Sequence, residues 1–267
     1  MKKIIALTLA LVMALGLFAG CGKESNPSSE TTPTTEAGPA WTTVTEGKLT
    51  MVTNAYFPPY EYYDGTKIVG IDVEIAEAIA KELGLELVIK DVQFESIISE
   101  VKAGSADFGL AGMTITPDRL EEVDFTISYA SGVQAIIVKE GSAITNVDDL
   151  YADGAAFKVG VQTGTTGDIY CTDDFGNDLV TRYANGNEAI VALLGGDVDC
   201  VIIDNEPAKA FVAANAGLKI LETAYADEDY AACFSKENTA LKEAVDAAIL
   251  KLTEDGTIDA IIAKYIK

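Results

Sequence analysis

The feature that most constrains the fold is an order of patterns that occurs twice along the chain. Each copy runs strand, turn, helix, strand, helix, a short Gly/Asp segment and strand, over residues 48–112 and again over 157–203. The Gly/Asp segments look alike: Val101–Asp107 is Val-Lys-Ala-Gly-Ser-Ala-Asp and Leu193–Asp199 is Leu-Leu-Gly-Gly-Asp-Val-Asp. Strands that alternate with helices predict an α/β fold in which helices pack on a mainly parallel sheet.

In the first copy, apolar residues lie on one face of a helix over Asp72–Leu83, and Gly84 follows as a C-cap. The remaining expected elements of this copy are strands at 48–53, 85–90 and 107–112 and a helix at 94–102. The second copy predicts strands at 157–161, 179–183 and 200–203 and helices at 167–170, 187–194 and 207–215. An apolar strand, Val133–Val138, lies between the copies. After them come Tyr230–Phe234 and two amphipathic helices at 239–254 and 258–266.

The first twenty residues predict export. Lys2 and Lys3 precede an uncharged apolar run, Ile4–Phe18, which fits a secretory signal peptide and is short for a membrane span. Small residues then precede Cys21, as in the bacterial lipobox, in which the cysteine is diacylated and becomes the new N-terminus. Two acyl chains suffice for stable anchoring. We expect a signal peptide over residues 1–20, and a lipidated Cys21 that holds the chain at the outer face of the bacterial cell membrane. Because Phe18 departs from the usual aliphatic residue, an ordinary signal peptide with an incidental cysteine is the alternative.

A tether is expected after the lipidated cysteine, within residues 21–46. Gly22–Ala40 is rich in Ser, Thr, Pro and Glu and has no aromatic or large aliphatic residue. Such a stretch cannot bury enough apolar surface to offset the entropy lost on ordering. The folded part should run from about Trp41 to Lys267, which is long for one compact domain and natural for two lobes.

Composition excludes several classes of function. The formal net charge is -23, whereas a nucleic-acid phosphate backbone needs stripes of Lys and Arg, so no nucleic-acid partner is expected. The chain has no His, the commonest general base and metal ligand at neutral pH, and we expect no cofactor or metal. The cysteines lack metal-type spacing. With Cys21 assigned to lipid, the remaining three (Cys171, Cys200 and Cys233) leave room for one disulfide, and structural thiols are the expectation.

Five motifs, in order and at family spacing, resemble the bacterial extracellular solute-binding proteins of family 3, the amino-acid receptors of ABC importers. They are Phe57–Glu61 (Phe-Pro-Pro-Tyr-Glu), Gly70–Glu74, Ala111–Arg119, Val159–Thr166 and Val201–Asp204. The resemblance covers almost all of Lys48–Lys267. It implies a two-lobed, type II periplasmic-binding-protein fold, with a mainly parallel sheet flanked by helices in each lobe. Two crossover strands, near 131–138 and 225–232, would form the hinge. Lobe 1 would comprise residues 48–133 and 229–267, and lobe 2 residues 134–228.

A cleft that closes on a free amino acid must satisfy its carboxylate, because unpaired buried charge is costly. Arg119 follows Thr116-Pro117, a pair suited to the N-cap and first position of a helix, and its guanidinium matches a carboxylate bidentately. A surface arginine paired with Glu121 or Glu122 is the alternative. Thr165 and Thr166 lie in a Gly-rich turn between a strand and a helix start, where backbone N–H groups favour an anion, although many such turns bind nothing.

The ammonium group of the ligand needs an anionic partner, and Asp204 is the candidate. It follows the strand at 200–203, and ligand sites in α/β sheets lie beyond the carboxyl ends of strands. Its alternative role is to cap the helix that starts next. The resemblance adds the carbonyl of Gly112 and the hydroxyl of Thr114 as further partners of the ammonium.

The resemblance places Phe57 and Phe94 on either side of the ligand side chain, although aromatic residues after strands are usually core. The distal end of the pocket would be lined by Asn54, Asp72, Met113 and Gln162. Relatives that bind histidine, lysine or arginine often carry an acid where this chain has Asn54. This departure argues against a strictly cationic ligand, although Asp72 would still serve one. The expected ligand is a polar L-amino acid, either glutamine-like or arginine/lysine-like.

The expected function is non-enzymatic binding and delivery to the membrane permease of an ABC importer, by a monomer. Some relatives of this fold are dehydratases of cyclohexadienyl acids. That alternative is disfavoured because no His is available as an acid/base group. A ligand-sensing module of a membrane kinase is disfavoured because the sequence up to Lys267 shows no membrane span or kinase segment after the folded part.

Overall fold

The computed structural model describes residues 41–266. The expected signal peptide, the lipidation site Cys21 and the tether up to residue 40 lie outside the described residues. Between residues 41 and 266, no helix combines the length and the apolar character that a membrane crossing requires.

The first sheet has the strand order β5-β1-β6-β14-β7. β1 (Lys48–Thr53) pairs in parallel with β5 (Glu86–Asp91) and β6 (Phe108–Gly109). β14 (Cys233–Phe234) then pairs antiparallel with both β6 and β7 (Asp124–Phe125). The sheet is therefore mixed: the strands of the first βα series are parallel, and a strand from the C-terminal third of the chain is inserted among them.

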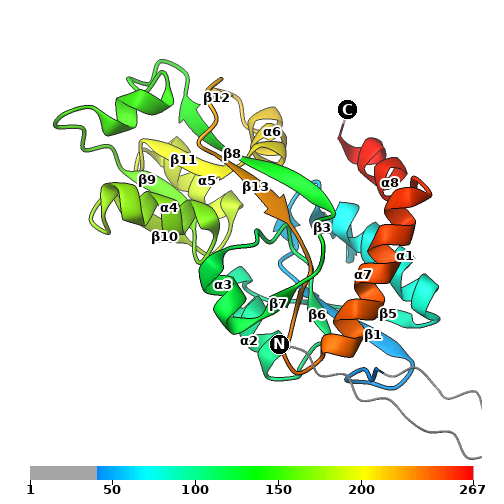
Figure 1. The fold of residues 1–267 in the computed structure, drawn as a ribbon. Helices are drawn as coiled ribbons and strands as arrows, with labels where there is room; N and C mark the ends of the chain where they lie inside the picture. The colour runs from blue at the N-terminus through cyan, green and yellow to red at the C-terminus, as the bar shows by residue number, and fades with distance from the viewer. Residues whose placement is uncertain (1–40, 267) are drawn as a thin grey trace, which may run out of the picture. The chain divides into compact units, whose positions relative to one another are not determined.

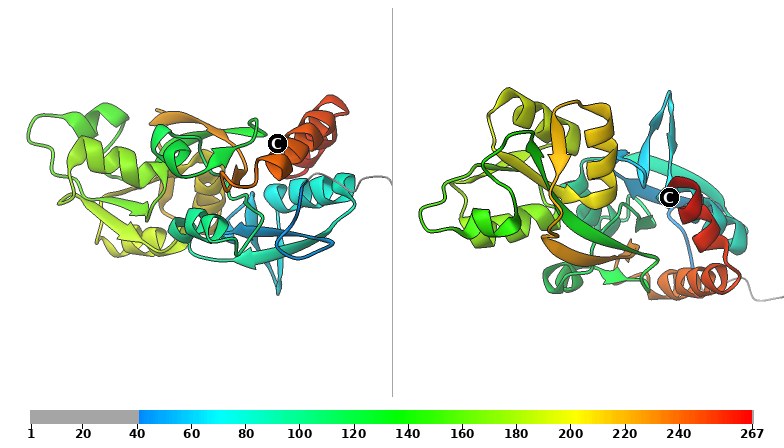
Figure 2. Two further views of the ribbon diagram at one scale, coloured as in Figure 1. Left: turned by 60° about the horizontal axis from the view of Figure 1, so that its bottom comes forward. Right: turned by 90° about the horizontal axis from the view of Figure 1, so that it is seen from above.

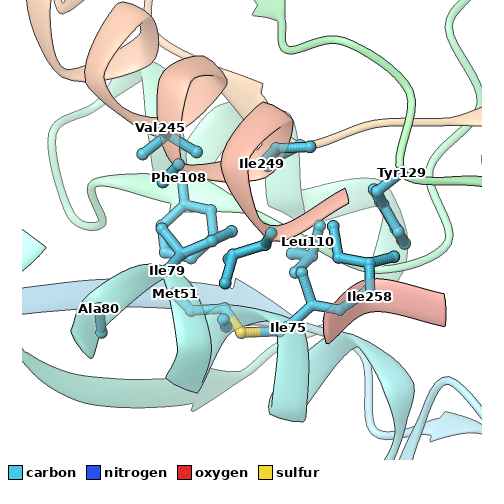
Figure 3. Packing of buried hydrophobic residues seen from close by; sticks show 14 of the residues in the cluster. Met51, Ile75, Ile79, Ala80, Phe108, Leu110, Tyr129, Val245, Ile249 and Ile258 are labelled. Atoms are coloured by element: carbon cyan, nitrogen blue, oxygen red, sulfur yellow. The ribbon is translucent and has the colours of Figure 1, made fainter. Parts of the chain in front are cut away.

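Helices pack on both faces of this sheet. Successive side chains of a strand point to opposite faces, so apolar neighbours on one strand pack into two separate cores. On β1, Met51 packs into a core with α1 (Ile71–Leu83), α7 (Thr239–Glu254) and α8 (Thr257–Tyr265) (Figure 3). Its neighbour Val52 packs into a separate core on the other side, with α2 (Ile97–Lys102) and the 3-10 turn before it (η1, Phe94–Ser96).

The second sheet has the order β10-β9-β11-β8-β12, with β13 also paired to β8. Its parallel strands are β9 (Val159–Gln162), β10 (Val180–Tyr183) and β11 (Cys200–Asp204), and its antiparallel ones are β8 (Ala130–Lys139), β12 (Leu218–Ile220) and β13 (Ala226–Tyr230). The helices that follow the parallel strands are α4 (Thr166–Phe175), α5 (Gly186–Gly195) and α6 (Asn205–Ala214). Here too the side chains of one strand alternate between two cores, Val201 and Ile203 in one and Cys200 and Ile202 in the other.

Two antiparallel strands connect the sheets, β8 running into the second sheet and β13 running out of it (Figures 1 and 2). Their register ends at Ala130 opposite Tyr230. Beyond that point the chain continues to β14 in the first sheet, and Tyr230 forms an isolated bridge with Thr114. Tyr230 thus lies where the connecting strands meet the first sheet.

The repeated Gly/Asp segments have the same local structure. The Asp107 carboxylate accepts a hydrogen bond from the Thr50 amide (2.6 Å), and the Asp199 carboxylate accepts one from the Lys158 amide (2.8 Å). Each aspartate amide donates back to the carbonyl of the same partner. Asp107 also accepts from the amide of Val44. Residues 41–46, assigned to the tether in the sequence, are therefore attached to the folded part.

The hairpin region between residues 56 and 69 was not predicted. β2 (Tyr56–Phe57), β3 (Glu61–Asp64) and β4 (Lys67–Val69) form a separate three-stranded sheet. Its tyrosines and prolines give no clear period-2 pattern. A 3-10 turn, η2 (Val147–Tyr151), also lacked a signal, and α4 is longer than the helix expected at 167–170.

The three cysteines within the described residues are buried and free. Burial raises the pKa of the Cys171 and Cys233 thiols to about 12, so both remain protonated at neutral pH. This agrees with the expectation of structural thiols.

Candidate functional site

A cavity lies beyond the carboxyl ends of strands from both sheets. Asn54 follows β1, Gln162 ends β9 and Asp204 ends β11, which brings side chains from distant segments to one place. All the predicted site residues except Asp72 and Met113 lie on its wall. The predicted residues on the wall are Asn54, Phe57, Phe94, Gly112, Thr114, Arg119, Gln162, Thr165, Thr166 and Asp204.

Arg119 is the cation of the cavity wall and is only 6% exposed. It lies on α3 (Pro117–Glu122), whose N-cap Thr116 accepts a hydrogen bond from the Arg119 amide, as the Thr-Pro pair predicted. Its Nη1 donates to the Thr114 carbonyl (2.7 Å) and its Nη2 donates to the Gly164 carbonyl (3.1 Å). The guanidinium also lies over the Phe94 ring, 5.5 Å from its centroid. Arg119 is thus buried and fixed, and it is not the surface arginine of the alternative interpretation.

Burial lowers the pKa of Arg119, and the negative charge of Glu228 offsets part of this effect. An arginine remains charged under these conditions. A buried guanidinium with donors left over favours an incoming carboxylate.

The wall beside Arg119 is the start of α4. Its N-cap, Thr165, accepts a hydrogen bond from the Asp168 amide, and its hydroxyl donates to the Gln162 carbonyl. Thr166 is the first helical residue, and N–H groups in the first turn of a helix have no partner within the helix. This wall therefore adds partial positive charge next to the guanidinium.

Asp204 is an acidic residue of the same cavity wall and is 1% exposed. One carboxylate oxygen accepts a hydrogen bond from the Glu206 amide (2.9 Å), so Asp204 does cap α6. The other accepts from the Val133 amide (3.2 Å) and the Tyr230 hydroxyl (2.5 Å). Asp204 therefore both caps α6 and lies on the cavity wall.

Burial raises the pKa of Asp204 to about 6, and its hydrogen bonds from Tyr230, Glu206 and Val133 offset part of the effect. Near neutral pH the carboxylate is mostly ionised and faces the cavity.

Aromatic rings and a glycine form the floor. Phe57 stacks on Tyr60 with ring centroids 5.5 Å apart, and Tyr60 meets Tyr230 edge to face at the same distance. Gly112 has φ +52, and a Cβ there would lie 2.8 Å from the Phe57 ring. Only glycine allows the backbone to adopt this conformation so close to the ring.

At the distal end of the cavity, the Asn54 side chain makes two hydrogen bonds. Its Nδ2 donates to the Val92 carbonyl (2.7 Å), and its Oδ1 accepts from Gln162 Nε2 (2.9 Å). Because Asn54 follows β1 and Gln162 ends β9, this hydrogen bond joins segments of the two sheets, as does the bond between Arg119 and Gly164.

The two remaining predicted residues lie behind the wall. Met113 is buried in the core shared with α2. Asp72 is fully buried on α1, where its Oδ2 accepts hydrogen bonds from the Gly112 amide and the Tyr129 hydroxyl, both at 2.8 Å. Asp72 therefore supports the Gly112 backbone instead of lining the cavity.

Several residues that the sequence did not single out as site residues also line the cavity. They are Glu61, Ala111, Gln134, Ile202, Ile203, Glu228 and Tyr230. Glu61 is the most informative, because its side chain is fully buried and neither oxygen receives a hydrogen bond from a described N–H or O–H group. The motif Phe57–Glu61 contained this residue, but its burial follows from the unpredicted hairpin, so the sequence carried no signal for its role.

The comparisons with known proteins agree with this architecture. The model of the bacterial extracellular solute-binding proteins, family 3, matches residues 49–267. An arginine-binding extracellular protein, ArtP, of Bacillus subtilis is 30% identical over 99% of this chain and 98% of its own length. A probable histidine-binding protein of Neisseria gonorrhoeae is 32% identical over 99% of this chain and 96% of its own length.

The solved structure of an ancestral arginine-binding protein bound to glutamine is 37% identical, with a TM-score of 0.77. It covers 83% of this chain, which covers 99% of that structure. The two-lobed, type II periplasmic-binding-protein fold is thereby confirmed, with sheets that are mixed. The chain belongs to the bacterial extracellular solute-binding proteins, family 3.

Proposed function

We propose that this chain is a non-enzymatic receptor that binds a free polar L-amino acid in the cavity and delivers it to the permease of an ABC importer. The observation that carries the proposal is the placement of a buried cation, Arg119, and a buried anion, Asp204, on the wall of one cavity. A free amino acid at neutral pH carries a carboxylate and an ammonium group, and this pair matches both. The first turn of α4 would add N–H groups to the carboxylate. The Gly112 carbonyl and the Thr114 hydroxyl would add acceptors to the ammonium.

The side-chain end of the cavity favours a cationic ligand over a neutral one. Glu61 lies on the wall without a donor, and the largest charges that act on its pKa are negative. A guanidinium or ammonium group would supply the missing charge and hydrogen-bond donors. Phe57 and Phe94 could add a cation–π contribution of about 0.5–2 kcal/mol. The names of the two relatives, arginine-binding and histidine-binding, agree with a cationic ligand, whereas the ancestral arginine-binding structure is bound to glutamine, a neutral one.

The lobes would act as two halves of one site. We assign residues 48–133 and 229–267 to lobe 1 and residues 134–228 to lobe 2, with both bounds inside the connecting strands β8 and β13. A ligand that contacts Arg119 and Asp204 at once binds the closed arrangement better than an open one, which is the condition for shifting the population toward closure. The importer would recognise the closed form, and diacylated Cys21 would keep the receptor at the outer face of the membrane.

The proposal is tested by a thermal-shift screen of the twenty amino acids, followed by titration calorimetry of the hits. A tight ligand raises the melting temperature by mass action. We expect Arg119→Ala and Asp204→Ala each to weaken binding at least about a hundredfold, because truncating one partner of a buried charge pair leaves the other unpaired.

Lys67→Ala and Asp197→Ala serve as matched controls, since both side chains are exposed and lie outside the cavity. Circular dichroism should show that all four variants are folded. Near-wild-type affinity in Arg119→Ala or Asp204→Ala would overturn the site assignment, and the absence of any amino-acid ligand would overturn the function.

A further inference from the structure

Two carboxyl groups lie together at the side-chain end of the cavity. Glu61, the first residue of β3, is on the wall, and Asp72, on α1, lies behind it: the Asp72 amide donates to the carbonyl of Tyr60, the residue before Glu61 (3.0 Å). Both side chains are fully buried. Tyr129 and the Gly112 amide donate to Oδ2 of Asp72, whereas Oδ1 of Asp72 and both oxygens of Glu61 receive no donor from a described N–H or O–H group.

This arrangement requires a proton. Two neighbouring ionised carboxylates inside a protein repel each other, and buried acceptors without donors are costly. One proton on the pair removes one of the two like charges. The donors on Oδ2 of Asp72 stabilise its ionised form, so the proton resides on Glu61.

The groups around Glu61 reinforce this distribution. The largest charges that act on it are negative and come from three elements: Asp72 on α1, Asp91 on β5 and Asp204 on β11. The neighbouring Tyr60 and Tyr129 are kept neutral because burial raises the pKa of both hydroxyls. Burial, and then the charge of Asp72, raise the pKa of Glu61 well above its usual value, and burial raises the pKa of Asp72 to about 6.

We infer that Glu61 and Asp72 share one proton, which is released to solvent when a cationic side chain enters the cavity and is retained when a neutral one does. The inference rests on the proposed function, since it concerns how the same site chooses its amino acid. No covalent bond changes: Glu61 gives up its proton, and the positive charge of the ligand replaces it. With a neutral amide or urea side chain, protonated Glu61 instead donates a hydrogen bond to the ligand oxygen. The external pH therefore sets the preference between the two classes of ligand.

The consequence is a pH dependence of opposite character for two nearly isosteric ligands. Release of one proton makes the affinity for arginine rise with pH, by at most about tenfold per pH unit. Citrulline has the same length but a neutral urea group. Its affinity should be constant at low pH and fall where Glu61 loses its proton without a ligand to compensate.

The experiment is titration calorimetry of wild-type protein with L-arginine and L-citrulline at several values between pH 5.5 and pH 8.5. At each pH the titration is repeated in two buffers with different ionisation enthalpies, which counts the protons released. We expect arginine to release a substantial fraction of one proton and to bind tighter as the pH rises. Citrulline should release none at the low end of the range.

Variants separate the carboxyl pair from the rest of the site. Glu61→Gln mimics the protonated state, so arginine should lose at least about tenfold in affinity and all its proton release, while citrulline binding is kept. Asp72→Asn removes the negative neighbour, so the pH dependence of arginine binding should shift to lower pH. The exposed Glu254→Gln is the matched control for loss of one negative charge.

The outcomes distinguish this inference from the function on which it rests. If arginine binds with an affinity that is flat from pH 5.5 to 8.5 and without proton release, the shared proton is refuted while the receptor function stands. If neither these ligands nor any other amino acid binds wild-type protein at any pH, the proposed function falls and the inference falls with it. Because proton release is measured on wild-type protein, a variant that fails to fold does not affect this decision.

Discussion

Asn54 uses both ends of its side-chain amide within the protein. Its nitrogen donates to Val92 and its oxygen accepts from Gln162. The absence of an acid at this position made a cationic ligand doubtful in the sequence. The hydrogen bonds give it another explanation, since Asn54 joins the two walls and a carboxylate at Glu61 lies elsewhere on the same cavity. An amide is required here because one atom must donate and the other must accept.

Asn54→Asp should therefore destabilise the ligand-free protein by about 1–3 kcal/mol at pH 8. The new carboxylate oxygen would face the Val92 carbonyl, where a donor 2.7 Å away stood before. At pH 5 the loss should be smaller, because a protonated aspartate can donate again. Urea denaturation measures both values.

Asn187→Asp is the control for the same chemical change. Asn187 is exposed in the first turn of α5, where a negative charge is neutral or slightly stabilising. Equal stability of Asn54→Asp and wild type at pH 8 would refute the bridging role of the amide.

At the residue scale, the sequence predicted groups whose position follows from local signals. Arg119 follows a Thr-Pro helix start, and Asp204 follows an apolar strand, so both could be placed at the mouth of a sheet. Glu228 could not, because its strand β13 pairs with β8, which is far away in the chain. Glu61 could not either, because its strand β3 belongs to a local hairpin sheet that has no period-2 pattern. The sequence placed Asp72 near the site correctly, but its side chain lies behind the cavity wall. That outcome depends on how α1 is rotated against Gly112 and Tyr129.

At the scale of elements, the connecting strands bring Gly132, Tyr230 and Asp204 into contact. A Cβ at Gly132 would lie 2.1 Å from the Tyr230 hydroxyl and 2.6 Å from the Asp204 carboxylate. Glycine at this place in β8 lets Tyr230 reach Asp204, and that hydrogen bond ties the connecting strand β13 to the end of β11.

Gly132→Ala should weaken amino-acid binding at least about tenfold and lower stability by about 1–3 kcal/mol, since the overlap must displace either Tyr230 or Asp204. Calorimetry and urea denaturation measure the two effects. The neighbouring Ser131→Ala, on an exposed side chain of the same strand, should leave both quantities nearly unchanged. Unaltered binding in Gly132→Ala would show that the contact between Tyr230 and Asp204 does not position the anion.

The helices and the central strands were predictable because each has its own periodicity and boundary signals. α1 ends at Gly84, which adopts the left-handed conformation, and α7 keeps one apolar face over its whole length. The strands near 133–138 and 230–234 were predicted too, but their antiparallel direction was not, because nothing local distinguishes β8 or β14 from a strand that adds in parallel. Their direction is fixed by the return of the chain between the sheets.

At the scale of the whole molecule, the strong negative charge and the buried acids act in the same direction. The formal net charge is -23, so self-repulsion grows as the remaining carboxyls ionise. Four buried carboxyls have a raised pKa, primarily because of burial: Glu61, Asp72, Asp107 and Asp204. In the unfolded chain the same groups titrate near pH 4.

The ligand-free protein should therefore lose stability steadily from pH 5 to pH 8. A raised pKa means that the folded state holds protons that the unfolded state has already released. The stabilising contribution of these groups is complete below about pH 4, and the part that comes from Asp72 and Asp204 is lost as the pH rises through about 6. Exposed carboxyls with lowered pKa, such as Glu122 and Asp149, act only at more acidic pH.

Urea denaturation at pH 5, 6, 7 and 8 measures this decline, and added salt separates its two causes. At about 0.5 M NaCl the repulsion between surface charges is largely screened, whereas desolvation of buried carboxyls is not. The decline should therefore persist in salt, and Glu61→Gln should reduce it, because that variant has one buried titrating group fewer. A stability that is flat or rises from pH 5 to pH 8 in high salt would mean that these acids are ionised in the folded state at no cost. The carboxyl pair in the cavity could then hold no proton to exchange for a ligand's charge.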